Sequence, residues 1–454
     1  MTTAQALAER VLDESTSEEA LIAIVDETSA VHVRWADDAL TTNGSARSRK
    51  LTVVLVVGGA VGAISCCGAL NFGEVGDLVG AARRNARENG AREPALLVGD
   101  VAANDWGRPP ASTDLAALTG VATYVRACSD RVRVHELSTY GYAEQQIRTT
   151  YMASSTGLRL RHEQPTAIVD LTAIRGDGRS AWAGCGAAHI GGIDLNAMTA
   201  NVDRTVSGAN RRANLSPGRY EVLFAPSCVA DLMVHLYRAT GAREAMDGHG
   251  VFSRPGGKSS LGERLSNAPL TLRSDPAERG LECAPFAIVR ASTDRCCVLD
   301  NGLPLLPTRW LTDGVLTALT QTRYTAEVMG QPRTAEIDNL VLHGPPGCAS
   351  LPEMIARTDR ALLVTSVWYL REVNRQRLML TGTTRDGVYL IERGAVVALL
   401  PDFRFNESPV DLLARVTEIG CTERTLPREW GDYFTRVAMP ALRVEAVGVS
   451  VAVQ

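Results

Sequence analysis

The sequence predicts an α+β protein in which an N-terminal unit of helices on an antiparallel sheet, residues 1–214, precedes a β-rich C-terminal unit, residues 215–454. Three observations predict this class. An uncharged run rich in valine and glycine fits a buried β-hairpin, an amphipathic helix follows it, and the C-terminal half consists mainly of short strands between Gly and Pro turns. A chain of 454 residues is long enough to bury two such cores.

The first elements differ in their hydrophobic period. Residues 4–25 have a helical pattern, and residues 30–40 alternate like a strand. Residues 51–72 carry no charge and are long enough to cross a bilayer. The glycines at Gly58 and Gly59 nevertheless favour a buried hairpin, LTVVLVV–GGA–VGAISCC, over a transmembrane helix.

An amphipathic helix is predicted over residues 73–89, because Val75, Leu78, Val79 and Ala82 fall on one face. The Pro-rich residues 105–114 are predicted to be a loop. Four strand-like runs follow this loop: RVRVHEL, IRTTYMAS, LRLRHE and TAIVDLTAI.

The second unit begins with a turn at Pro217-Gly218, a strand over residues 219–225 and a helix with Ser227 as its predicted N-cap. Four apolar residues line one face of this helix: Val229, Leu232, Met233 and Leu236. Further strands are expected in APLTLRSD, LVLHGPPG and GVYLIERGAVVALL.

The composition excludes several function classes. A formal net charge of −4 leaves no overall positive field for nucleic acid or an acidic membrane surface. Ten unevenly spaced cysteines, including the adjacent pairs Cys66-Cys67 and Cys296-Cys297, do not form a disulfide framework, so we expect reduced, mostly buried thiols. The polar, acidic N-terminus is unlike a signal peptide, and a cytoplasmic protein is expected.

Three stretches resemble catalytic or cofactor motifs without meeting their requirements. VVGGAVG lacks the G-x-G-x-x-G spacing that a dinucleotide turn needs. PGGKSS ends like a phosphate-binding loop at residues 257–259, but Phe252 stands where the first glycine is required. The turn Gly184-Cys185-Gly186, near His189, could present a nucleophile, although an inert cysteine is the simpler interpretation.

Several blocks, in order and spacing, resemble the TldD/TldE family of bacterial peptidases, also called the PmbA or modulator-of-gyrase family. The similarity runs nearly from end to end. Its blocks are DDALTTNGSARSRKLTVVLVVGGAVGAIS, LSPGRYEVLFAPSCVADLMVHL, GERLSNAPLTLRSDPA, LDNGLPLLPTRWLTDGVL and TRDGVYLIERGAVVALLPDFRF. All basic residues except Lys50 and Lys258 are arginine, which indicates a high-GC, actinobacterial-like source.

The resemblance implies where a zinc site would be. In the TldD-type members, the helix after the PGxY strand carries H-E-x-x-x-H, and a cysteine near the C-terminus is the third ligand. Here His235 occupies the first position, Leu236 replaces the glutamate, and Thr240 replaces the second histidine. Cys421 is the last cysteine and lies before the ligand position. One ligand of three cannot form a hydrolytic zinc site, so no metal is expected in this chain.

His249, with Asp247 nearby, could in principle join His235 in an unorthodox site, which we do not expect. The resemblance instead implies a TldE-type, non-catalytic subunit of a heterodimer with a TldD-type partner that holds the zinc. The pair would enclose a chamber for unfolded peptide. Leu270, Leu272 and Arg273 are the candidate substrate-channel residues, on a predicted edge strand where peptide would pair main chain to main chain.

Three alternatives remain open from the sequence. The chain could belong to a TldD/TldE-type hydrolase for an antibiotic or peptide natural product, acting on a small amide-bearing intermediate. It could be a self-sufficient peptidase or amidase homodimer with unorthodox ligands. It could also be a gyrase-modulating binding protein, although the net charge of −4 argues against direct DNA contact.

Overall fold

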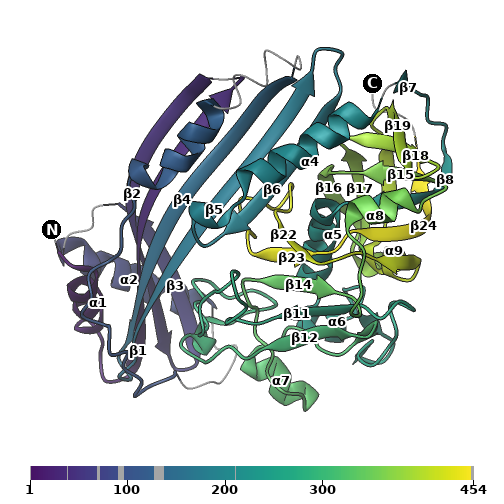
Figure 1. Cartoon of the computed structure of the whole chain (residues 1–454). Helices are drawn as coiled ribbons and strands as arrows, with labels where there is room; N and C mark the ends of the chain where they lie inside the picture. Colours follow the sequence, from purple (N-terminus) through teal and green to yellow (C-terminus); the bar gives the residue numbers. More distant parts are fainter. Residues whose placement is uncertain are drawn as a thin grey trace.

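The computed structural model describes residues 2–37, 39–68, 72–89, 97–126, 137–209 and 211–450 (Figure 1). A long twisted sheet forms the N-terminal unit, and a more compact β-rich unit lies against it. The α+β class predicted from the sequence is confirmed, with the antiparallel sheet and its helices first and the β-rich part second.

The N-terminal sheet has six antiparallel strands in the order β3-β2-β1-β4-β5-β6. Four of its strands are 17 to 19 residues long, which makes the sheet unusually tall. The strands are β1 (Glu19–Ala36), β2 (Ala39–Val57), β3 (Ala60–Cys67), β4 (Leu137–Ser154), β5 (Arg159–Arg175) and β6 (Ser180–Ala187).

The predicted uncharged hairpin is confirmed as β2–β3. Its turn uses Gly58 and Gly59 at φ 55° and 79°, the left-handed backbone that a two-residue hairpin turn demands. In the described parts of the chain, no helix is both long and apolar enough to cross a membrane.

The helices that cover this sheet include α1 (Ala4–Leu12), α2 (Phe72–Asn89) and α4 (Leu195–Gly208). Helix α2 confirms the predicted amphipathic helix, with Val75, Val79 and Ala82 buried and Leu78 partly buried. The predicted helix over residues 4–25 is wrong beyond Leu12. The chain turns over residues 13–18, and the β-branched run after it enters β1, where both faces are covered.

The predicted strands after the loop at residues 105–114 merge into two long ones. IRTTYMAS lies in β4, whereas LRLRHE and TAIVDLTAI both lie within β5. Most of RVRVHEL lies outside the described residues, and only its last residue, Leu137, is seen to begin β4.

The C-terminal unit is built on a seven-stranded and a six-stranded mixed sheet. The first has the order β21-β24-β8-β15-β18-β19-β7, and its strands are β7 (Arg211–Arg212), β8 (Gly218–Phe224), β15 (Arg360–Val364), β18 (Val388–Glu392), β19 (Ala395–Leu400), β21 (Val416–Ile419) and β24 (Leu442–Val449). The second has the order β13-β12-β11-β14-β23-β22, and its strands are β11 (Thr271–Ser274), β12 (Thr308–Thr312), β13 (Val315–Leu316), β14 (Leu340–His343), β22 (Glu423–Thr425) and β23 (Val437–Met439).

Smaller elements complete this unit. A three-stranded sheet joins β16 (Val367–Asn374), β17 (Met379–Thr384) and β20 (Arg404–Glu407), and a short hairpin joins β9 (Ser253–Arg254) and β10 (Lys258–Ser259). The helices are α5 (Pro226–Arg238), α6 (Ala242–Met246), α7 (Arg323–Met329), α8 (Leu351–Ala356) and α9 (Pro409–Leu413).

Helix α5 lies at the centre of the C-terminal core. The predicted apolar face is buried, but so are residues on the other faces, including Asp231. Burial all round is typical of a central rather than a surface helix. The predicted N-cap at Ser227 is wrong, because Ala225 occupies the cap and Ser227 Oγ instead donates to the Leu426 carbonyl at 3.0 Å.

The expectation of reduced thiols is wrong at one place. Cys348 and Cys421 form a disulfide that joins the segment after β14 to the segment after β21. Neither adjacent pair, Cys66-Cys67 or Cys296-Cys297, forms a disulfide, as predicted. Three of the seven described cysteines outside the disulfide are buried, so the expected burial holds for only part of the set.

Candidate functional site

The helix that would carry a zinc motif in this family is α5, and His235 lies in its last turn. The His235 ring meets Trp430 edge-to-face at a centroid distance of 5.1 Å, and its buried Nε2 has no hydrogen-bond partner among the described residues. Burial, together with the positive charges of Arg238 and Arg371, lowers the pKa of His235 to about 4. The imidazole is therefore neutral at neutral pH.

The other two motif positions face the protein interior. Leu236 is 1% exposed and belongs to the core around α5. Thr240 is also buried, and its hydroxyl bonds with the Tyr237 carbonyl at 2.7 Å and with Thr320 Oγ1 at 2.8 Å. Neither side chain can hold a metal ion or act as a base for water.

A buried carboxylate fixes the segment that packs against His235. Asp231, one turn earlier on α5, accepts backbone N–H groups of Arg428, Glu429 and Trp430 at 2.9 to 3.3 Å. Arg238 also lies over the Trp430 ring, at 4.8 Å from its centroid. The motif helix is therefore packed against residues 428–430, with cations where metal ligands would be needed.

The donor set around His235 does not fit zinc, which binds neutral imidazole, thiolate and carboxylate groups. No group of three or more His, Cys, Asp or Glu side chains within the described ranges could hold a metal ion. His249 is exposed and makes no such cluster with His235, and Cys421 is committed to the disulfide with Cys348.

The segment predicted to contact substrate forms β11, but β11 is not an edge strand. It pairs with β12 on one side and β14 on the other, so that expectation is wrong. Leu270 and Leu272 are fully buried, and Arg273 forms an ion pair with Glu278. A peptide could pair with this backbone only by displacing a neighbouring strand.

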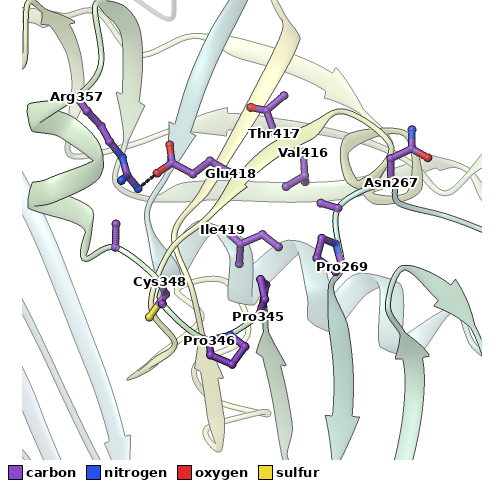
Figure 2. A pocket seen from close by; sticks show the side chains of 13 residues that line it. Asn267, Pro269, Pro345, Pro346, Cys348, Arg357, Val416, Thr417, Glu418 and Ile419 are labelled. Carbon is purple, nitrogen blue, oxygen red and sulfur yellow. Dashed lines mark hydrogen bonds and ion pairs between the residues drawn. The ribbon is translucent and has the colours of Figure 1, made fainter.

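The start of the same segment lines an open groove of about 490 Å³ (Figure 2). Residues 267–269 form one wall, residues 345–349 another, and strand β21 runs along a third side. Strand β21 pairs only with β24 within the described sheet, and on its other side a bridge from Gly420 to Ala349 forms only beyond the strand, so the edge over residues 416–419 is unpaired. An unpaired strand edge can take up an extended peptide through main-chain hydrogen bonds.

The groove offers a surface for binding, but its lining lacks an unpaired acid, a histidine or a thiol that could catalyse hydrolysis. Figure 2 shows Pro345 and Pro346 beside Ile419, and Arg357 reaching Glu418. Glu418 also accepts from Arg443 Nε at 2.8 Å, so its carboxylate is neutralised on both sides. The only cysteine in the lining, Cys348, is in the disulfide, which fastens this wall to the chain beyond β21.

The three rejected motifs have structural explanations. Gly58-Gly59 forms the hairpin turn, and Lys258 lies in the small β9–β10 hairpin after two left-handed glycines. Cys185 lies in β6, where burial raises the pKa of its thiol and leaves it unreactive. A Cβ at Gly186 would lie 2.1 Å from the Thr435 carbonyl oxygen, so this glycine permits close packing of the two units.

Sequence reasoning missed the groove because its walls come from segments far apart in the chain. Residues 267, 345, 357 and 418 meet only through the tertiary fold. The local signal was the Pro345-Pro346-Gly347 turn, which stiffens one wall but does not identify its opposite side.

The fold and this helix define a metallopeptidase-like protein in which His235 alone, of the three motif positions on and after α5, carries a metal-binding group. Residues 217–451 match the family model described as the PmbA/TldA metallopeptidase C-terminal domain, so the chain belongs to the PmbA/TldD/TldE family. No curated protein matches the chain significantly in sequence.

Solved structures are similar over almost the whole chain. One from Thermotoga maritima, assigned as a modulator of a DNA gyrase, has a TM-score of 0.78 at 16% identity and covers 99% of this chain and 100% of its own. TldE from Thermococcus kodakarensis has 0.77 at 15%, covering 98% and 99%. A protein from Bacteroides thetaiotaomicron, also assigned as a modulator of DNA gyrase, has 0.75 at 16%, covering 98% of each chain. At such identities the likeness establishes the fold alone.

Proposed function

We propose that this chain is a TldE-type, non-catalytic subunit that acts with a TldD-type zinc-bearing partner in the hydrolysis of unfolded peptides. The observation that carries the proposal is the environment of α5. His235 packs on Trp430 among arginines, Leu236 lies in the core, and Thr240 is bonded to Thr320. The zinc and the general base would then come from the partner.

The substrate-channel role first assigned to Leu270, Leu272 and Arg273 moves, in this proposal, to the groove beside them. Two features support the groove: the unpaired edge of β21 and the exposed Thr417 on it. Pairing through main-chain groups tolerates many peptide sequences, which suits a chamber for unfolded chains. The division into residues 1–214 and 215–454, the cytoplasmic location and the actinobacterial-like source likewise remain proposals.

A reconstitution assay tests the proposal. The chain alone should cleave no unfolded peptide, whereas its mixture with the TldD-type partner should do so, and His235→Ala should leave that activity unchanged. Cleavage by the chain alone that is lost in His235→Ala would overturn the non-catalytic role.

A second assay tests the groove. In the mixed complex, Thr417→Trp should raise KM for peptide several-fold, because an indole would fill the space beside β21. Thr41→Trp, on an exposed strand outside the groove, is the matched control and should change nothing. Equal effects of the two variants would remove the groove from the proposal and leave the subunit role standing.

A further inference from the structure

A second cavity, of about 460 Å³, lies where the two units meet. The N-terminal sheet contributes Arg148 and Thr150 from β4 and His162 from β5. The C-terminal unit contributes the end of α5, residues 283–297 and residues 335–338. The volume is within the roughly 300–1,000 Å³ typical of small-molecule sites.

Most charges in this lining are already paired. The four ion pairs, each at 2.6 to 3.0 Å, are Arg290–Asp26, Arg295–Glu336, Arg323–Asp300 and Arg436–Asp338. Two lining cations remain. Within the described part of the chain, neither Arg148 nor Arg238 forms an ion pair, and the Arg238 guanidinium lies over the Trp430 ring. The lining therefore holds two guanidinium groups that are not in an ion pair.

A polar group independently points to a ligand. Gln321 is 3% exposed and lines the cavity, and its Oε1 has no hydrogen-bond partner among the described residues. A buried acceptor without a donor is destabilising, and a ligand N–H would satisfy it. The remaining walls include the apolar side chains of Phe286, Ile288 and Leu305.

We propose that this junction cavity binds an N-acylated amino acid or short peptide through its free carboxylate. The guanidinium groups of Arg148 and Arg238 supply the positive charge and the paired N–H donors that carboxylates prefer. Gln321 Oε1 accepts the amide N–H, and Phe286 and Leu305 contact an apolar side chain. The paired carboxylates of Glu336 and Asp338 on the same wall disfavour the second negative charge of a phosphate.

The cavity binds its ligand without reacting with it. Burial raises the pKa of Cys283 to about 12 and also raises the pKa of Cys296, so both stay protonated thiols at neutral pH. Burial lowers the pKa of His162, whose Nε2 is 2.9 Å from Gln164 Oε1. The peptide class of the ligand is consistent with the proposed function, but the site itself does not depend on which subunit holds zinc.

Calorimetry on the full chain, without any partner, tests this site. N-acetyl-leucyl-leucine should bind, whereas N-acetyl-leucyl-leucinamide, which lacks the carboxylate, and inorganic phosphate should bind at least tenfold more weakly. Arg148→Gln and Arg238→Gln should each weaken binding of the acid about tenfold. Arg360→Gln is the control, since its side chain is 72% exposed and lies outside the cavity.

Several results would overturn the proposal: equal binding of the acid and the amide, binding of phosphate alone, or loss of binding in Arg360→Gln. Thermal unfolding of each variant shows whether it is folded, and Arg148→Gln decides the matter if Arg238→Gln, which contacts Trp430, is unstable. Because binding is measured without peptidase activity, its failure is distinguishable from a failure of the proposed function.

Discussion

The motif helix α5 and the groove along β21 differ in what each provides. Helix α5 has His235 in its last turn, but its surroundings are filled by Trp430, by core residues and by arginine side chains. The groove has about 490 Å³ of space and an unpaired strand edge, but its lining contains no histidine, no aspartate and no free cysteine. Of these two regions, one therefore holds the motif histidine and the other holds the accessible strand edge.

A hydrolytic enzyme needs both in one place, because the base, the metal and the scissile bond must lie within hydrogen-bonding reach. Their separation between α5 and the groove is consistent with the proposed role of a subunit that binds peptide without cleaving it.

The largest loss of stability is expected at Asp231, which fixes residues 428–430 against the motif helix α5. Asp231→Ala should lower the free energy of unfolding by about 4 kcal/mol, because three buried N–H groups of residues 428–430 lose their acceptor. Urea unfolding measures the change. Asp359→Ala, at an exposed position, should cost less than about 0.5 kcal/mol. A loss below about 1 kcal/mol for Asp231→Ala would contradict the tight packing described for this region.

The second largest loss of stability is expected when the disulfide of the groove wall is removed. Replacing both Cys348 and Cys421 by serine should cost about 3 kcal/mol, because the disulfide closes a loop with a sequence separation of 73. Dithiothreitol should lower the stability of the wild type by a similar amount and leave the double variant unchanged. Alkylation of the protein in cells before lysis would show whether the bond forms there, and free thiols at both positions would mean that the groove wall is not cross-linked in the cell.

The contribution of buried His235 to the free energy of unfolding should be smaller and should depend on pH. The pKa of His235 is about 4 when folded and 6.5 when unfolded, so below pH 6.5 the unfolded state binds the proton more tightly. The native state should lose about 2–3 kcal/mol between pH 6.5 and pH 4 from this residue, and nothing above that window. His235→Phe should flatten this part of the stability profile. His249→Phe, at an exposed position, should leave it as in the wild type, and identical profiles for both variants would contradict the buried, neutral state of His235.

The fold was largely predictable because its signals are local. The Gly58-Gly59 turn and the apolar spacing in α2 each act within one element, so sequence order was sufficient. The predicted N-terminal helix is too long because the apolar run that enters β1 also fits a helical period. Only the pairing with neighbouring strands decides that this run is a strand and not a helix.

The site was predictable only in part. The family resemblance implies that Leu236 replaces the base and Thr240 a ligand, and this prediction needs only the order of residues along one helix. The edge location of β11 could not, because strands β12 and β14, from distant parts of the chain, complete its pairing. The Cys348–Cys421 bond, the groove and the junction cavity likewise depend on contacts between remote segments.

Zinc analysis of the purified chain tests the central claim most directly. The chain alone, expressed with zinc in the medium, should contain far less than one zinc per chain, and His235→Ala should not change that content. The TldD-type partner purified in parallel should contain about one zinc per chain. One zinc per chain in this protein, lost in His235→Ala, would contradict the account.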